Sequence, residues 1–264
     1  MNRDMNILCL FAACILMLAA ALAPAADAPR PAADAPKPAQ DPNLVWSDEF
    51  DGTALDVSKW GYHYPGKRRD GVTVKEAAAL DGQGHLLITT SKVGNEYHTS
   101  MIETRGKFER TFGYFECRVK LQTQIGHWSA FWLMPHNMGK VVGDLKTSGA
   151  EIDIFEYLRN KPDKVQHTLH WDGYGKDHKS LPHVHDQPGI GEGWHTVGLD
   201  WTEKEYVFYV DGKETWRTDK AVSQAPQYII LSLEIGKWAG NIADAKLPDS
   251  IMFDYVRVYK TRPK

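Results

Sequence analysis

The chain has 264 residues, 42% of them hydrophobic and 25% charged, which is an ordinary globular composition with room for one large core. Its 31 basic and 34 acidic residues leave a net charge of −3, too near neutral to indicate a nucleic-acid partner or a polybasic membrane partner. We therefore expect neither.

The first segment, residues 1–23, has the plan of a secretory signal peptide. Arg3 is followed by an apolar run from Ile7 to Leu22 and by small residues at Ala21, Ala23 and Ala25. The run is short for a bilayer span, which needs about 20 apolar residues. An uncleaved anchor, or lipidation at Cys14, fits this pattern less well. We expect a secreted or periplasmic protein that leaves the membrane after cleavage.

A proline- and alanine-rich segment follows at 24–42. Residues 24–30 read P-A-A-D-A-P-R and are repeated at 31–37 as P-A-A-D-A-P-K. Such a sequence has too few apolar side chains to fold, and its prolines favour an extended spacer. The segment is therefore predicted to be a linker, with the folded domain at 43–264.

The rest of the chain consists of short apolar runs separated by turn residues, and none shows the 3.6-residue period of a long amphipathic helix. Asp211-Gly212 is a two-residue hairpin signal. Cys117 is expected to be a small buried hydrophobe, and 178–185 a solvated loop. This pattern predicts an all-β antiparallel sandwich or barrel. The predicted strands are 85–91, 114–121, 129–134, 165–171, 195–201, 206–210, 228–235 and 252–259.

One further predicted strand, G-A-E-I-D-I-F-E-Y-L at 149–158, places three carboxylates among β-branched and aromatic residues. In a regular strand Glu151 and Asp153 would share one face and Glu156 would enter the core. A β-bulge at Ile154–Phe155 would return Glu156 to the face of the other two. The strand is therefore predicted to be bulged.

Three carboxylates on one face suit glycoside hydrolysis, which needs one carboxylate as a nucleophile or base and one protonated carboxyl as an acid. The pair is about 5–5.5 Å apart in retaining enzymes and about 6.5–9.5 Å apart in inverting ones. Because like charges this close cannot all ionise, the cluster should hold a shared proton near neutral pH. A Ca²⁺ site or the solvated face of an edge strand are the alternatives.

The run E-I-D-I-F-E resembles the catalytic signature of glycoside hydrolase family 16 in its bulged form. F-G-Y-F-E-C-R-V-K-L, G-H-W-S-A-F-W-L-M-P and F-D-Y-V-R-V-Y are similar to other strands of that family, so that the resemblance covers about 43–260. It implies a concanavalin A-like β-jelly roll of two antiparallel sheets with a concave substrate cleft, and a retaining mechanism that requires no cofactor. Glu151 would be the nucleophile, Asp153 the assisting carboxylate and Glu156 the acid/base.

Aromatic side chains offer flat apolar platforms to sugar rings. Trp128 and Trp132 would share one face of a strand, and the resemblance places that face in the cleft, although a core position is the alternative. The resemblance also implies that Trp238 lies at the cleft rim, with a plug of its own loop as the alternative, and that His170 lines the leaving-group side. Zinc binding by His167 and His170 is disfavoured, because residues three apart on a strand face opposite sides.

The family often carries a structural calcium ion, and the matching positions are Glu49, Gly84 and Asp254. The resemblance predicts a monomeric, endo-acting enzyme whose partner is a polysaccharide, with β-1,3- or β-1,3(4)-glucan as the expected substrate. Ser129 departs from the common glucanase W-P-A-F-W, and the basic run Lys67–Arg69 could meet sulfate groups. Hydrolysis of an algal galactan (agar, porphyran or carrageenan), transglycosylation, and lectin-like binding without cleavage therefore stay open.

Overall fold

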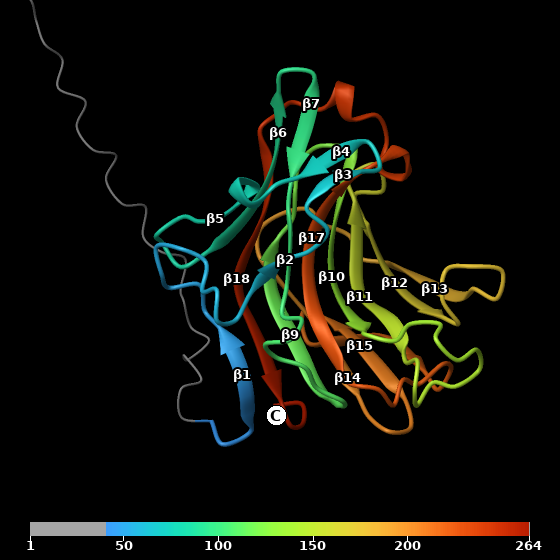
Figure 1. The fold of residues 1–264 in the computed structure, drawn as a ribbon. Helices are drawn as coiled ribbons and strands as arrows, with labels where there is room; N and C mark the ends of the chain where they lie inside the picture. The colour runs from blue at the N-terminus through green and yellow to red at the C-terminus, as the bar shows by residue number, and fades with distance from the viewer. Residues whose placement is uncertain (1–40, 264) are drawn as a thin grey trace, which may run out of the picture. The chain divides into compact units, whose positions relative to one another are not determined.

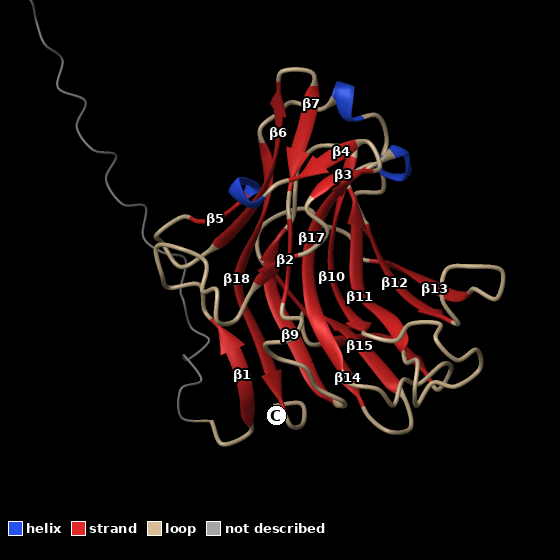
Figure 2. Ribbon diagram, viewed as in Figure 1, coloured by secondary structure: helices blue, strands red, loops and turns tan. Residues whose placement is uncertain are grey.

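The structure, a computed structural model, describes residues 41–263, which lie within one compact unit. The predicted signal peptide at 1–23 and nearly all of the predicted linker at 24–42 lie outside the described residues. Within 41–263 the regular structure is strand, apart from three single-turn 3₁₀ helices, as Figure 2 shows. These are η1 (Lys75–Ala77), η2 (Lys237–Ala239) and η3 (Ile242–Asp244). None of these described helices has the length and apolarity needed to cross a bilayer.

The larger of two sheets has 11 strands, all paired antiparallel except β4 with β7. The pairing joins segments far apart in the chain, because β9 lies between β14 and β18 (Figure 1). Its path is β16 (Lys213–Thr218), β15 (Tyr206–Val210), β14 (His195–Trp201), β9 (Gly113–Lys120), β18 (Asp249–Tyr259), β6 (Leu86–Val93), β7 (Glu96–Thr99), β4 (Gly71–Thr73) and β3 (Gly66–Arg68), with β1 (Leu44–Asp48) beside β18 and β5 (Ala78–Leu80) beside β6.

The second sheet has 7 strands and carries the carboxylate segment on β11, next to its central strand β10. Its order is β13 (Lys179–Asp186), β12 (Lys164–Trp171), β11 (Ala150–Leu158), β10 (His127–Pro135), β17 (Gln227–Ile235), β8 (Met101–Glu103) and β2 (Gly61–Tyr62). Figure 1 shows β17, β10 and β11 running side by side.

The two sheets are joined by one hydrophobic core, to which alternate side chains of their strands contribute. Phe115 and Val256 come from the larger sheet, and Phe131 and Leu231 from the smaller; all four are fully buried. Cys117 is buried in the same cluster, as expected, and burial raises the pKa of its thiol. The predicted all-β sandwich of two sheets is confirmed.

Every predicted strand is present, and the Asp211-Gly212 hairpin joins β15 to β16 with both residues at positive φ, 49° and 73°. The predicted loop at 178–185 is wrong, because Lys179–Asp186 form β13, paired with β12 over their full length. The strand was missed because it lies at a sheet edge and buries little of either face. Its residues alternate between partly and fully exposed, so that its sequence has no apolar face.

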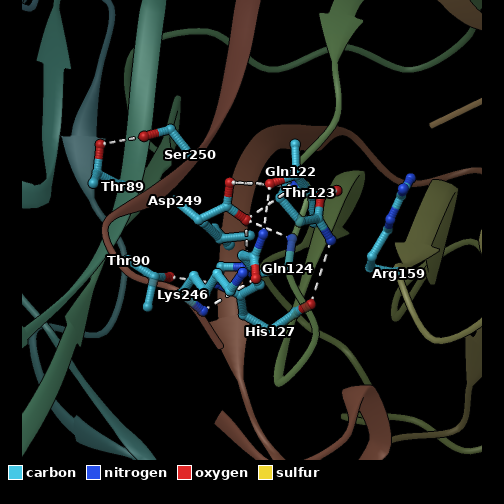
Figure 3. Close-up of polar contacts among 12 residues, drawn as sticks. Thr89, Thr90, Gln122, Thr123, Gln124, His127, Arg159, Lys246, Asp249 and Ser250 are labelled. Atoms are coloured by element: carbon cyan, nitrogen blue, oxygen red, sulfur yellow. Dashed lines mark hydrogen bonds and ion pairs between the residues drawn. The ribbon is translucent and has the colours of Figure 1, made fainter. Parts of the chain in front are cut away.

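A buried polar network joins the two sheets at Asp249 of β18 (Figure 3). The Asp249 carboxylate accepts hydrogen bonds from the backbone N–H groups of Thr123 and Gln124, at 3.0 and 2.8 Å. It also lies 3.0 Å from Nε2 of His127 on β10, whose Nδ1 is 2.7 Å from Oγ1 of Thr90 on β6. Burial by itself would raise the pKa of Asp249, but the hydrogen bonds from His127 and Gln124 lower it overall.

Candidate active site

The predicted bulge in β11 is present. Asp153 pairs with Thr168 and Glu156 with Gln166 of β12, so that three steps along β11 match two along its partner. On the other side, β10 shows the same irregularity between Phe131 and Trp132. One extra residue therefore re-phases β11 between its second and third carboxylates.

The bulge separates the apolar and acidic side chains of β11. Ile152, Ile154 and Phe155 all point into the core, where they are at most 1% exposed. The three carboxylates line a cleft of about 410 Å³ over the smaller sheet. Its other lining residues are His63, Tyr64, Arg68, Arg69, Trp128, Ala130, Trp132, Met134, His170, Tyr174, His178, Ser232 and Glu234. The site thus joins the acids with aromatic platforms, as a sugar-processing cleft requires.

The electrostatics of the cleft favour protonation of its acids. Burial, with repulsion from Glu156 and Glu234, raises the pKa of Glu151 to about 8. Burial also raises the pKa of Glu156 to about 7, although a hydrogen bond from Thr168 opposes the rise. The pKa of Asp153 is raised well above its usual range, again mainly by burial. The acids titrate as one coupled cluster, which retains protons at neutral pH.

Each acid has its own polar neighbours. Glu156 accepts hydrogen bonds from Oγ1 of Thr168 at 3.0 Å and from Nε2 of Gln166 at 3.4 Å. The hydroxyl of Tyr174 donates a hydrogen bond to Oε2 of Glu151. These neighbours give the two glutamates different environments although they share one strand.

The wall of the cleft on β17 carries a fourth acid that the sequence analysis missed. Glu234 pairs across the sheet with Trp128 and is 7% exposed. Its carboxylate accepts hydrogen bonds from Nε of Arg68 at 2.8 Å and from Nε of Arg69 at 3.0 Å. The guanidinium of Arg69 also lies 5.3 Å from the ring centre of Trp128. Two residues of the basic run Lys67–Arg69 therefore line the cleft, although Arg69 is also exposed to solvent.

The predicted tryptophans lie at or beside the cleft. Trp128 and Trp132 line it and are 6% and 7% exposed, and Nε1 of Trp132 donates to Oγ of Ser232 at 3.1 Å. Trp238 is 40% exposed and packs edge-on against Trp128, with ring centres 5.5 Å apart. Trp238 does not line the cleft itself, which places it next to the rim. Their contact with sugar stays a prediction.

His170 lines the cleft, with Nε2 3.6 Å from Oδ2 of Asp153 and 4.0 Å from Oε1 of Glu151. Burial lowers the pKa of His170 to about 4, so that its ring is neutral at pH 7. Its Nδ1 is 2.9 Å from Nε2 of His178, and the two rings stack. His178 was expected to lie in a solvated loop, but it lines the cleft.

The two carboxylates at the predicted calcium positions are each paired with an arginine. Glu49 accepts two hydrogen bonds from Arg257, at 3.1 and 2.8 Å, and Asp254 accepts one from Arg118 at 2.6 Å. Gly84 is buried at φ 91° in the turn before β6. An arginine already compensates each carboxylate, so that this donor set does not fit Ca²⁺ as it is arranged. The calcium ion stays a prediction that the side-chain arrangement does not support.

One acidic group in the described chain does converge, and it lies in the cleft. Oxygen and nitrogen atoms of Glu151, Asp153 and His170 fall within 4.8 Å of one another. These donor types also occur in divalent-metal sites. The bulge brings two glutamates to one face of β11, and an acid–base role for this pair explains the same group of side chains. Residues 67–257 match the family model of Glycosyl hydrolases family 16.

The chain belongs to Glycosyl hydrolases family 16. As a member of this family it is an O-glycosyl hydrolase, and its two-sheet structure is the jelly roll of the laminarinases. The laminarinase of Flavobacterium sp. UMI-01 superposes with a TM-score of 0.70 at 29% identity, covering 82% of this chain and 99% of that one.

Relatives of known name differ in substrate and in length. A beta-glucanase of Rhodothermus marinus is 30% identical over 82% of this chain and 85% of its own length. A glucan endo-1,3-beta-glucosidase A1 of Niallia circulans is 28% identical over 83% of this chain, which spans 38% of that protein. A keratan-sulfate endo-1,4-beta-galactosidase of Sphingobacterium multivorum is 29% identical over 83% of this chain and 56% of its own length.

Proposed function

We propose that this chain is an endo-acting, retaining glycosidase that cleaves β-1,3- or β-1,3(4)-glucan. The observation that carries the proposal is the bulge in β11, which brings Glu151 and Glu156 to one face inside a cleft lined by aromatic side chains. A lectin would not need buried acids whose pKa values are raised together, and this feature favours an enzyme over a binding module.

In the proposed mechanism Glu151 is the nucleophile. Burial raises the pKa of Glu151 as well as that of Glu156, so this role requires the shared protons of the cluster to lie on Asp153 and Glu156. The Glu151 carboxylate attacks the anomeric carbon while Glu156 donates a proton to the departing glycosidic oxygen. The covalent glycosyl ester is then hydrolysed by a water molecule whose proton returns to Glu156. Asp153 remains protonated, because its pKa is raised, and so limits the negative charge beside the nucleophile. Each cycle returns both glutamates to their starting states.

Glucan is the proposed substrate because one of the three relatives above is named a beta-glucanase and another a glucan endo-1,3-beta-glucosidase, and because the superposed structure is a laminarinase. A galactan or another β-galactoside polymer is the second candidate. The keratan-sulfate endo-galactosidase and Ser129 in W-S-A-F-W favour it. Arg68 and Arg69, which line the cleft, offer cations to a sulfated chain, although Glu234 already binds both.

We also infer that the protein acts after export, as a monomer, in the periplasm or outside the cell. The signal-peptide pattern at 1–23 and the spacer composition at 24–42 support export. Cell fractionation of the full-length protein, followed by N-terminal sequencing of the mature chain, tests this inference. A mature chain that keeps residues 1–23 would contradict it.

The test of activity is a panel of purified polysaccharides, with laminarin, mixed-linkage β-glucan, agarose, porphyran, carrageenan and keratan sulfate as substrates. We expect oligosaccharides from laminarin or mixed-linkage glucan. Proton NMR of the first products should show the β-anomer, which reports two displacements and a closely spaced carboxylate pair. Initial release of the α-anomer would mean that Glu151 is not a nucleophile, and binding without cleavage of any polymer would favour the lectin.

A further inference from the structure

The loop between β12 and β13, residues 172–178, places a phenol on a buried carboxylate. The Tyr174 side chain is 60% exposed, yet its hydroxyl donates a hydrogen bond to Oε2 of Glu151, a residue only 7% exposed. The other carboxylate oxygen, Oε1, lies 4.0 Å from Nε2 of His170. Tyr174 therefore reaches from the mouth of the cleft to one of the two oxygens of the proposed nucleophile.

The base of this loop is held by Asp172, which has a positive φ of 63° and is 5% exposed. Its carboxylate accepts hydrogen bonds from the backbone N–H of Gly143 and from Nζ of Lys179, both at 2.7 Å. The neighbouring backbone is packed closely as well, because a Cβ built on Gly139 would come within 2.4 Å of the Cα of Gly173. The turn that leads into Tyr174 is thus fixed by contacts from two directions.

The far end of the loop contacts the cleft through His178. His178 stacks on His170, with ring centres 5.1 Å apart, and their nitrogens are 2.9 Å apart. The ring of Tyr174 also lies against His178, with ring centres separated by 5.6 Å. Because both ends of the loop are anchored, the position of the Tyr174 hydroxyl follows from the fold and not from a freely rotating surface side chain.

We propose that Tyr174 is a positioning residue that hydrogen-bonds the Glu151 carboxylate and so stabilises its ionised form. The inference rests on the proposed function, since it assigns Tyr174 a role toward the nucleophile. The phenol keeps its proton throughout and holds Oε2, which leaves Oε1 to attack the anomeric carbon. The hydrogen bond weakens when Glu151 becomes an ester and strengthens again as the carboxylate leaves, which favours hydrolysis of the intermediate.

A hydrogen-bond donor to Oε2 opposes the other influences on the pKa of Glu151. A hydrogen bond to the charged form lowers a carboxyl pKa, whereas burial and neighbouring acids raise it. The other titratable or charged groups that face Glu151 are Asp153 and Glu156 on β11, His170 on β12, His178 in the loop, Glu234 on β17, and Arg68 and Arg69 at β3 and the turn after it.

The decisive experiment compares Tyr174→Phe with the wild-type enzyme, because Phe removes the hydroxyl and keeps the ring. Glutamate side chains are labelled with ¹³C at the carboxyl, and the signal that disappears in Glu151→Gln is followed from pH 4 to 10. We expect its midpoint to rise by roughly one pH unit in Tyr174→Phe. An unchanged midpoint in a folded Tyr174→Phe variant would overturn the proposal.

Tyr64→Phe is the matched control. Tyr64 also lines the cleft and is 53% exposed, and within the described chain it hydrogen-bonds none of the three acids of β11. Removing its hydroxyl should leave the Glu151 midpoint where it is. An equal shift in both variants would assign the change to general solvation of the cleft and would contradict a specific role for Tyr174.

With a substrate found by the polysaccharide panel, Tyr174→Phe should lower kcat roughly ten- to hundred-fold with little change in KM. The acidic limb of its kcat/KM profile should move to higher pH together with the titration. A KM effect alone would make Tyr174 a sugar platform and overturn the proposal. The titration needs no substrate, so that a panel without any cleavage would remove the proposed function while the Tyr174 contact is still judged by the NMR shift.

Discussion

Two regions of this protein bury carboxylates near a histidine, and their pKa values move in opposite directions. At the Asp249 network, backbone N–H groups and His127 all donate toward one carboxylate, and the net effect lowers its pKa. In the cleft, Glu151 and Asp153 face other acids, and the nearest ring nitrogen of His170 is 3.6 Å from Asp153, beyond a good hydrogen bond. Burial alone therefore does not decide the charge of a carboxylate; the balance between hydrogen-bond donors and neighbouring acids around it does.

This contrast also separates stability from function. The Asp249 carboxylate on the larger sheet is satisfied by donors from β10 of the smaller sheet and from the loop before it, as structural polar groups in cores are. The cleft instead holds like charges together, an arrangement that opposes folding and supplies protons for chemistry. Three measurements on variants of the two regions test this contrast.

The largest effect is expected on activity. Glu151→Gln and Glu156→Gln should each reduce turnover to below a few per cent, a loss of about 10²–10⁴-fold, because each removes a group that bonds to carbon or transfers a proton. Asp153→Asn should lose less, since it takes neither step. Turnover is measured with the best polysaccharide of the panel, and circular dichroism checks the fold. More than a few per cent of wild-type turnover in either Gln variant would refute the assignment.

The second effect is expected on stability. Asp249→Ala leaves the N–H groups of Thr123 and Gln124 and the ring of His127 without their acceptor. Thr123 is exposed and Gln124 is partly buried, so water can replace the acceptor of both N–H groups. The cost of about 1–3 kcal/mol for an unpaired buried donor therefore falls on His127, and the free energy of unfolding should fall by roughly that amount. Urea denaturation measures the loss, and Asp249→Asn, which keeps one acceptor oxygen, should lose less. Turnover below the unfolding transition should stay near wild type, and a loss of turnover without a loss of stability would reverse the roles of the two regions.

The smallest effect is expected in the pH dependence of stability. The folded-state pKa of Glu151 is raised to about 8 from an ordinary value of about 4.3. The contribution of its protonation to the free energy of unfolding is therefore fully present below pH 4.3 or so, about the ordinary pKa, and is lost as the pH rises through the folded-state pKa. Glu151→Gln, which cannot ionise, should therefore gain a few degrees in Tm over wild type at pH 8.5 and little at pH 4.5. Calorimetry at both values measures the difference.

Asp249 should show the opposite pH dependence of stability. Its folded-state pKa is lowered, so that its contribution is present above the ordinary value of about 3.9 and is lost as pH falls through the folded value. Asp249→Ala should accordingly differ least from wild type in strong acid. A gain by Glu151→Gln that is equal at both pH values would show that packing, and not charge, changed.

Much of the fold was determined by local sequence pattern. Apolar alternation predicted the strands from 85 to 259, and Asp211-Gly212 predicted its hairpin, because side-chain period and turn conformation are properties of neighbouring residues. The spacing of Glu151, Asp153 and Glu156 among core-forming residues determined the bulge, since a regular strand would have buried one glutamate in the hydrophobic core.

Tertiary structure decided what surrounds those carboxylates. Arg68, Tyr174 and Glu234 lie far from 151–156 in the chain, and strand pairing and loop anchoring bring them to the same cleft. Strand β13 escaped prediction because an edge strand needs no apolar face. A sequence shows which side chains could meet a nucleophile. Which ones do so depends on sheet order and register, because these determine how distant segments lie side by side.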